Sequence, residues 1–299
     1  MMDFEKRLTE IAGAANVKLE EPMKNHTTFR IGGPAQYFVT PENVDALILV
    51  IGLCRGEEKP FAVIGNGSNL LVSDQGYQGV VISTEKLDHC QVEGNQIRAE
   101  AGVKLARMAK QALEHGLAGL EFAAGIPGTV GGALVMNAGA YGSEMKNVLV
   151  DAVLLTKDGA VIRRTGEELE LGYRTSNIPT EGLTVLEAEV RLQSGDKTEI
   201  LRVMNDLAAK RREKQPLEYP SAGSTFKRPE GYFAGKLIDD AGLRGFQVGG
   251  AQVSEKHCGF VINRNQATAA DVEELCHQVA EKVKEQSGVD LEMEIKRLG

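Results

Sequence analysis

The sequence predicts a mixed protein, α+β or α/β, made of two or three lobes. Its 299 residues exceed a typical domain, because single hydrophobic cores stop growing near about 250 to 300 residues. Helical and strand-like hydrophobic patterns alternate along most of the chain. Glycine reaches 34 residues while Trp is absent, so the composition favours backbone freedom. We therefore expect a ligand bound between lobes and held by glycine-rich loops.

The first lobe is expected over residues 1–84. Apolar residues from Val44 to Cys54 recur at the spacing of a helix that buries one face. Three short apolar runs then predict buried strands, at Phe61–Ile64, Leu70–Val72 and Gly79–Ile82.

The second lobe is expected over residues 85–205. Leu105, Met108, Ala112 and Leu113 predict a helix that Gly116 ends. Strand patterns follow at 148–155, 160–162 and 183–192.

The third lobe is expected over residues 206–299, with its C-terminal residues allowed to pack with the first lobe. A helix over 198–212 leads to a boundary loop at Tyr219–Ser224. Thr268 and Asp271 have the spacing of a helix-capping pair, and Ser287–Gly288 ends that helix. The alternating segment 289–296 predicts a half-buried strand.

Composition excludes several classes of protein. A net charge of −8 argues against a nucleic-acid coat, which needs an excess of Lys and Arg on one face. No segment approaches the roughly 18 apolar residues of a membrane span, and the start lacks a signal-peptide core, so we expect a cytoplasmic protein. The four cysteines lack metal-ligand spacing, so we expect no metal and reduced structural thiols.

Two glycine turns are the main candidate binding elements. The first glycine turn, Gly65–Asn69, follows a buried strand and matches neither the Rossmann nor the Walker pattern. The second glycine turn, Gly125–Gly132, combines four glycines with Pro127, and the small residues of 137–142 extend it. Either turn alone is also compatible with a plain tight turn, but together they predict a phosphate-bearing ligand.

Three polar positions could carry chemistry, although the sequence has no nucleophile elbow or triad spacing. Arg174 suits bidentate capture of a carboxylate, or a structural ion pair. Ser224 is either a hydroxyl donor or a cap. Glu294 lies on the expected polar face of the last strand, where a solvated side chain is the simpler interpretation. The basic residues 210–214 suit either a helix C-terminus or an anionic ligand.

A family resemblance rests on five colinear motifs. The chain closely resembles the UDP-N-acetylenolpyruvoylglucosamine reductases (MurB), in their shorter subtype, from Asn25 to Gly299. The motifs are Asn25–Gly33, Gly65–Leu70, Gly119–Gly132, Tyr173–Arg174 and Ala222–Lys227.

The resemblance implies a fold, a cofactor and a reaction. The fold is the vanillyl-alcohol-oxidase type, in which two lobes enclose a non-covalent FAD and a third α+β domain covers the substrate. Members take hydride from NADPH onto FAD and pass it to C3 of the enolpyruvyl ether of UDP-N-acetylglucosamine. The product is UDP-N-acetylmuramate, for peptidoglycan synthesis.

The resemblance also assigns residues. Ser224 would donate a proton to C2, while Arg174 and a protonated Glu294 would stabilise the charge at the substrate carboxylate. Lys214 and Lys227 would face substrate or nucleotide phosphates. The FAD contacts would be Gly65, Asn66, Gly67, Ser68, Asn69, Leu70, Gly125, Ile126, Pro127, Gly128, Gly131, Gly132, Asn137 and Ala138.

The chain departs from the family pattern at two places. Arg228 stands where longer members carry a substrate-contacting Asn, and Met293 replaces a common Pro, so the choice of Glu294 over Glu292 depends on register. We expect a monomer that binds the UDP-sugar and NADPH. The alternatives are a flavin-dependent alcohol or sugar oxidase of the same fold, and a nucleotide-sugar-binding regulator without turnover.

Overall fold

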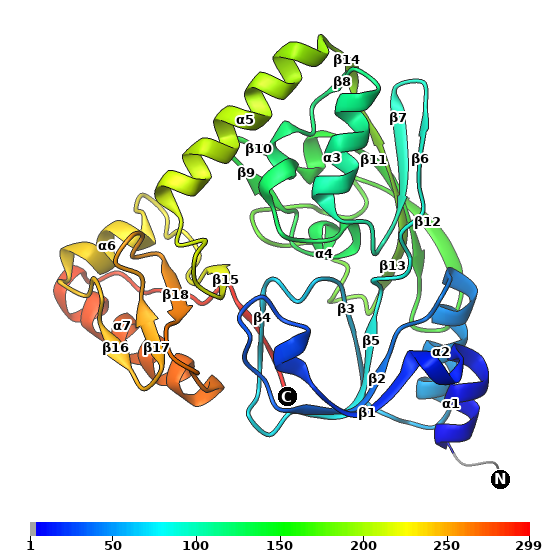
Figure 1. The fold of residues 1–299 in the computed structure, drawn as a ribbon, viewed down its shortest axis with the longest axis horizontal. Helices are drawn as coiled ribbons and strands as arrows, with labels where there is room; N and C mark the ends of the chain where they lie inside the picture. The colour runs from blue at the N-terminus through cyan, green and yellow to red at the C-terminus, as the bar shows by residue number, and fades with distance from the viewer. Residues whose placement is uncertain (1–3) are drawn as a thin grey trace. The chain divides into compact units, whose positions relative to one another are not determined.

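The computed structural model describes residues 4–299 (Figure 1). They form two compact units. The first comprises the chain up to Leu19, Tyr37–Asn66 and Gly79–Arg211, and the second comprises Glu20–Gln36, Gly67–Gln78 and Arg212–Gly299. Because one crossing falls between Asn66 and Gly67, the first glycine turn contributes residues to both units.

A four-stranded sheet in the order β1-β2-β5-β3 contributes residues to both units, because the divisions after Leu19, Gln36 and Gln78 fall within β1, β2 and β5. Strands β3 and β5 are parallel, and Phe61 lies opposite Val80. Helix α2 begins where the Asn43 side chain accepts a hydrogen bond from the Ala46 amide at 2.9 Å, and it confirms the predicted helix. The elements are α1 (Phe4–Ala12), η1 (Ala14–Asn16), β1 (Val17–Pro22), β2 (Pro34–Val39), α2 (Val44–Gly56), β3 (Phe61–Ile64) and β5 (Tyr77–Ser83).

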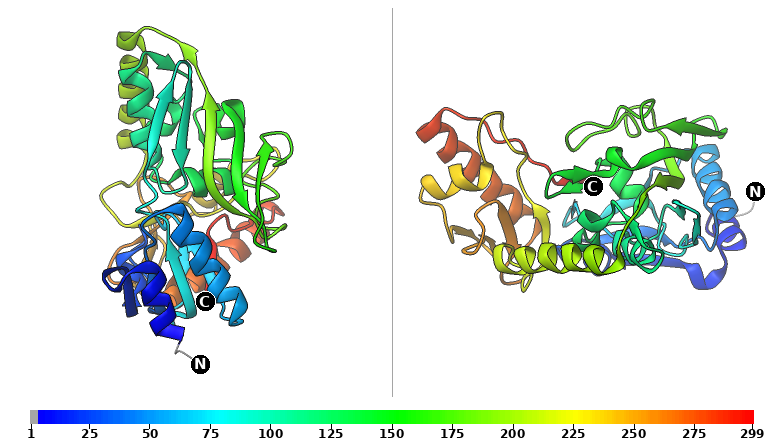
Figure 2. Two further views of the ribbon diagram at one scale, coloured as in Figure 1. Left: turned by 90° about the vertical axis from the view of Figure 1, so that its right-hand side faces the viewer. Right: turned by 90° about the horizontal axis from the view of Figure 1, so that it is seen from above.

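A five-stranded antiparallel sheet, in the order β12-β11-β13-β7-β6, lies in the first unit. Helix α4 packs on β13 and β7, and α3 packs on β7 and β6; the long strands are visible in the left view of Figure 2. The elements are β6 (Cys90–Glu93), β7 (Gln96–Glu100), α3 (Leu105–Glu114), β8 (Leu117–Ala118), η3 (Glu121–Gly125), α4 (Val130–Val135), β9 (Gly139–Ala140), β10 (Ser143–Glu144), η4 (Met145–Asn147), β11 (Leu149–Leu155), β12 (Val161–Thr165), β13 (Thr184–Arg191) and β14 (Gln193–Ser194).

Helix α5 (Lys197–Lys214) follows this sheet and is mostly exposed. Ile200 is its only buried residue, and Arg202 pairs with Glu199 and Asp206 on its solvent side. The helix covers the predicted segment 198–212 and continues to Lys214. Its last turn carries the basic residues that the sequence singled out.

The second unit has a four-stranded sheet in the order β15-β18-β17-β16, covered by α7, with α6 packed on α7. The predicted cap of α7 is confirmed: Thr268 Oγ1 accepts from the Asp271 amide at 3.0 Å, and the Asp271 carboxylate accepts from the Thr268 amide at 3.0 Å. The elements are η2 (Met23–Asn25), β4 (Leu70–Val72), β15 (Ser221–Ser224), α6 (Ala234–Asp240), β16 (Gln247–Val248), β17 (Ala251–Val253), β18 (Phe260–Asn263), α7 (Ala269–Ser287) and β19 (Lys296–Leu298).

Two segments differ from the prediction. Part of the expected boundary loop is strand β15, whose Ser224 lies opposite Phe260; small residues and a proline hid this strand from the pattern. The expected terminal strand over 289–296 is wrong: within 289–295 Met293 forms an isolated bridge with Phe226, and the strand β19 begins at Lys296, where it pairs in parallel with β4. Glu294 is only 8% exposed rather than solvated, and its backbone is hydrogen-bonded to Thr225 and Asn69 from distant segments of the chain.

Residues 4–299 form three hydrophobic cores. Two lie in the first unit, one beside the four-stranded sheet and one beside the five-stranded sheet, and the third lies in the second unit. The second unit's core also takes Phe29, Ile31 and Leu71 from the N-terminal part of the chain. The bounds predicted for three lobes remain a prediction. No helix among residues 4–299 is long and apolar enough to cross a membrane.

Candidate functional site

The two glycine turns meet within the first unit. A Cβ atom added to Gly65 would lie 2.1 Å from Thr129 Oγ1, so only glycine fits there. Asn66 Nδ2 donates to the Pro127 carbonyl at 2.7 Å. The start of the first turn and the middle of the second are therefore packed directly together, as the sequence analysis expected of a shared ligand site.

Only part of the second glycine turn is available to a ligand. The amides of Val130 and Gly131 donate to the carbonyls of Val103 and Ala101 at 2.9 and 2.8 Å. Gly132 differs, because an added Cβ would meet nothing closer than 3.8 Å. Gly132 therefore offers open space for a close approach to the backbone.

Two polar groups beside the second turn lack partners among residues 4–299. The Thr129 hydroxyl is buried and makes no hydrogen bond. The half-buried Arg211 guanidinium, from α5, makes no hydrogen bond or ion pair, and a Cβ on Gly125 would lie 3.3 Å from its Cδ and Nη1. Burial lowers the pKa of Arg211, as expected for a cation without a counterion.

Arg174 is held in a strained two-residue turn. Gly172 and Thr175 pair across it, and Arg174 itself has a φ of 54°, a left-handed value that disfavours non-glycine residues. Its Nη2 donates to the Gly139 carbonyl at 3.2 Å. Asn137, which is fully buried, donates to the Gly172 carbonyl at 3.0 Å and accepts from the Lys146 amide at 3.0 Å. The side chain of Asn137 is thus committed to supporting this turn.

The chain segments that carry Ser224 and Glu294 are hydrogen-bonded to each other in the second unit. Ser224 is exposed at the end of β15. The next residue, Thr225, is fully buried, and its carbonyl accepts from the Glu294 amide at 2.8 Å. Asn69 Nδ2 donates to the Glu294 carbonyl at 3.2 Å, so the end of the first glycine turn holds the same segment.

The two glutamates near the C-terminus differ in environment. Glu292 is exposed and ion-paired with Lys227, whereas Glu294 is buried. This difference supports the choice of Glu294, although its role stays a prediction. Lys214, at the end of α5, is exposed.

The cysteines and His257 form no metal centre. No group of three or more His, Cys, Asp or Glu residues among 4–299 could hold a metal ion. Burial raises the pKa of Cys258 to about 11 and that of Cys276 to about 12. Burial lowers the pKa of His257, and the positive charges of Arg244 and Lys214 lower it further.

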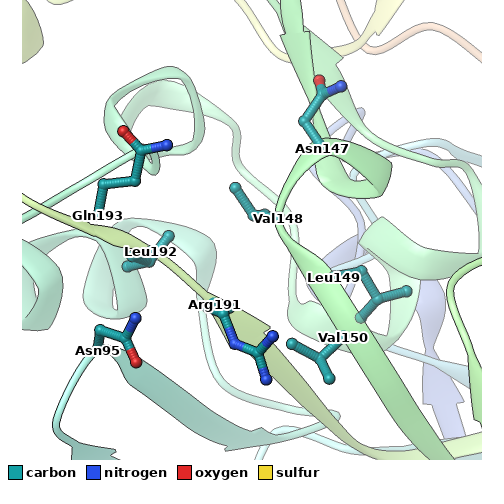
Figure 3. Close-up of a pocket in the computed structure, with 8 residues that line it drawn as sticks. All are labelled: Asn95, Asn147, Val148, Leu149, Val150, Arg191, Leu192 and Gln193. Carbon is teal, nitrogen blue, oxygen red and sulfur yellow. The ribbon is translucent and has the colours of Figure 1, made fainter.

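Figure 3 shows a separate pocket in the first unit. It has a volume of about 560 Å³ and lies between the β6–β7 turn and the ends of β11 and β13. Its polar side chains are Asn95, Asn147, Arg191 and Gln193. None of its lining residues belongs to either glycine turn or to the predicted catalytic set.

Comparisons with known proteins agree with this geometry. An FAD binding domain family matches residues 35–165, which include both glycine turns. The C-terminal domain of UDP-N-acetylenolpyruvoylglucosamine reductase matches residues 215–298. A crystal structure of this reductase from Thermus caldophilus has a TM-score of 0.81 and 38% identity, over 95% of this chain and 98% of that one.

Relatives with the same name cover the whole chain. The enzyme from Agathobacter rectalis is 53% identical over 99% of this chain and 98% of the relative. The enzyme from Clostridium kluyveri is 49% identical over the same shares of the two chains. A glucose oxidase variant of the pollen protein Phl p 4 is 15% identical, with a TM-score of 0.52 over 65% of this chain and 44% of its own, which shows the fold alone.

Fold and site together define an FAD-dependent oxidoreductase, in which an FAD-binding part with the vanillyl-alcohol-oxidase-type fold is joined to an added α+β domain. The chain belongs to the UDP-N-acetylenolpyruvoylglucosamine reductase family. The residues fit the cofactor, since Gly132 leaves room for a close approach to the backbone and the unpaired Arg211 places a cation beside the same turn. The alternatives of an oxidase and of a regulator without turnover receive no such support.

Sequence reasoning missed Thr129 and Arg211. Thr129 stands inside the second turn, between Gly128 and Gly131, and was passed over for its glycines. Arg211 belongs to a run of four cations at 210–214, and helical periodicity alone does not show which of them faces the turn.

Proposed function

We propose that this protein reduces the enolpyruvyl ether of UDP-N-acetylglucosamine to UDP-N-acetylmuramate, with Arg174, Ser224 and Glu294 as its catalytic residues. The reaction is a step of peptidoglycan synthesis and uses NADPH as reductant. The observation that carries the residue assignment is the exposed Ser224 hydroxyl, whose strand is tied through Thr225 to the buried Glu294.

Ser224 acts as the proton donor. Bound FAD supplies the hydride that it has taken from NADPH. Once C3 of the substrate carries that hydride, negative charge develops at C2 and on the adjoining carboxylate. A serine hydroxyl is a weak acid, but a carbanion-like carbon is a strong enough base to take its proton. Water then restores the proton on the serine oxygen.

Arg174 and Glu294 stabilise the charge that reaches the substrate carboxylate. The guanidinium fork of Arg174 matches the two carboxylate oxygens, and the turn that carries it is held by Gly139 and Asn137. Glu294 stabilises that charge only as the protonated acid, which donates a hydrogen bond. Each such donor is worth about 3 to 4 kcal/mol in the transition state.

The remaining assignments concern binding. FAD would contact Gly65–Leu70 and, around the second glycine turn, Gly125–Gly128, Gly131, Gly132, Asn137 and Ala138, where Gly132 leaves room for it. Lys214 is proposed to bind a phosphate of the substrate or of NADPH, because it is exposed. Lys227 is proposed for the same task, with Glu292 holding its ammonium group.

Location and oligomeric state complete the proposal. Nucleotide sugars and NADPH are cytoplasmic metabolites, and all four cysteines are free, as suits a reducing compartment. A cytoplasmic location is proposed on these grounds, and a monomer is proposed alongside it. Sedimentation of the purified protein tests the monomer directly.

Anaerobic half-reactions test the function. NADPH should bleach the flavin absorbance of the purified protein, and UDP-N-acetylenolpyruvoylglucosamine should then restore it with formation of UDP-N-acetylmuramate. A bleached flavin that this substrate leaves unchanged means that the proposed reaction is wrong.

The variant Ser224→Ala separates the two half-reactions. Bleaching by NADPH should be unchanged, whereas turnover of the sugar substrate should be lost. Thr28→Ala, which removes a hydroxyl bonded to the Ser221 carbonyl at 2.7 Å, is the control for loosening the same strand. Slow bleaching in Ser224→Ala, or equal turnover loss in both variants, would remove Ser224 from its role.

A further inference from the structure

The two glycine turns carry no positive charge of their own. Gly65–Asn69 and Gly125–Gly132 contain neither Lys nor Arg, while a nucleotide diphosphate brings two negative charges. The amides of Val130 and Gly131 are also already engaged within the protein. A diphosphate lying along the second turn would therefore need a cation from another element.

Arg211 is the cation that the first unit places there. It lies in the last turn of α5, and its Cδ and Nη1 would each lie 3.3 Å from a Cβ added to Gly125. It falls between the two family matches, which end at residue 165 and begin at residue 215. Neither match therefore assigns it a role.

The charge of Arg211 is not neutralised within the protein. Among residues 4–299 it has no hydrogen-bond or ion-pair partner, and the group that interacts with its charge is the phenol of Tyr141 rather than a carboxylate. Other arginines of this unit, such as Arg98, Arg163 and Arg202, are paired with acids. A half-buried guanidinium without a counterion is unfavourable by itself and gains most when an anion arrives.

We infer that Arg211 is a phosphate-binding residue of the cofactor turn, which neutralises the diphosphate of FAD as it lies against Gly125. The inference rests on the assignment of the second glycine turn to FAD. The same chemistry would suit a phosphate of NADPH or of the UDP-sugar, and the experiment below separates these sources. Arginine suits the task because its planar fork can donate to two phosphate oxygens at once.

The test compares Arg211→Gln and Arg211→Lys with Lys210→Gln. Lys210 is exposed and precedes Arg211 on the same helix, so Lys210→Gln removes the same charge at a neighbouring position. Apoprotein of each is titrated with FAD at low and high salt, and the KM values for NADPH and for the UDP-sugar are measured in FAD-saturated enzyme. Arg211→Gln should raise the Kd for FAD by about ten- to a hundred-fold. Arg211→Lys should raise it less, and Lys210→Gln should stay within about two-fold of wild type.

A structural role would give a different result. Because Arg211 is unpaired in the free protein, apo Arg211→Gln should melt at or above the temperature of wild-type apoprotein, and its FAD affinity should depend less on salt. An unchanged Kd for FAD with a raised KM for one nucleotide assigns the phosphate to that nucleotide. An unchanged Kd and unchanged KM values, or weaker FAD binding explained by a less stable apoprotein, would overturn the inference. FAD titration needs no turnover, so a failure of the proposed reaction would be seen separately.

Discussion

Replacing Asn137 by Asp changes one atom in the support of the Arg174 turn. Asn137 is fully buried. Its Oδ1 accepts from the Lys146 amide and its Nδ2 donates to the Gly172 carbonyl, each at 3.0 Å. Asp keeps the first bond and the side-chain size but turns an oxygen towards the Gly172 carbonyl. Its backbone also tolerates the φ of 39° nearly as well as Asn does.

The expected cost follows from these contacts. A buried carbonyl left without its donor costs about 1 to 3 kcal/mol. Repulsion between the Gly172 carbonyl and the introduced carboxylate adds to this cost. A total near 3 kcal/mol corresponds to a fall in melting temperature of roughly 6 to 12 °C for a chain of this size. The loosened turn should also lower kcat by about ten-fold or more, because Arg174 is no longer held in position.

Acidification should partly rescue Asn137→Asp. A protonated carboxyl can donate to the Gly172 carbonyl, so folding raises the pKa of the introduced Asp above its unfolded value of about 3.9. The stability it contributes is then present at low pH and lost as pH rises through the folded pKa. The difference in melting temperature between Asn137→Asp and wild type should therefore be smaller at pH 5 than at pH 8.

Thermal melting with excess FAD, FAD titration and steady-state kinetics together test this reasoning. Asn43→Asp is the control for the same chemical change, since the exposed Asn43 side chain caps α2 by accepting from the Ala46 amide, which Asp does as well, and it should cost less than about 1 kcal/mol. If Asn137→Asp melts with wild type and loses FAD affinity instead, the side chain contacts the flavin and the supporting role is refuted.

Three further predictions concern other parts of the protein. Glu294→Gln should lower kcat about 10²- to 10³-fold, whereas Glu292→Gln should change it little, because an exposed ion pair contributes less than about 1 kcal/mol; equal kcat values for the two variants would contradict the assignment. Gly132→Ala should leave the apoprotein folded and weaken FAD binding, while Gly65→Ala should lower the melting temperature of the apoprotein itself; weak folding of both would show that Gly132 has no open space. Because burial lowers the pKa of His257, its unfolded form binds the proton first, so stability should fall as pH drops below about 6.5. In His257→Gln, melting curves at pH 5 and 7 should differ less than in wild type.

The hydrophobic patterns predicted helices such as α2, α3, α5 and α7 and strands such as β3, β11 and β13, because these depend on local spacing. Helix α2 follows from the residues between Val44 and Cys54, and the cap of α7 follows from Thr268 and Asp271. Strand β15 and the buried Glu294 could not be predicted in this way. Both depend on partners far along the chain, such as Phe260 and Thr225.

The sequence by itself determined the ligand class and the family. Glycine turns and motif order are local properties, and the colinear motifs identified an FAD-dependent reductase before any geometry was known. Only the tertiary structure decided which side chains are engaged in contacts within the protein and which remain available to a ligand. It committed Asn137 to the Arg174 turn, paired Lys227 with Glu292, buried Glu294, and left Arg211 unpaired beside Gly125. These outcomes depend on contacts between distant segments, and burial changes the free energy of a charge in a way that no local pattern encodes.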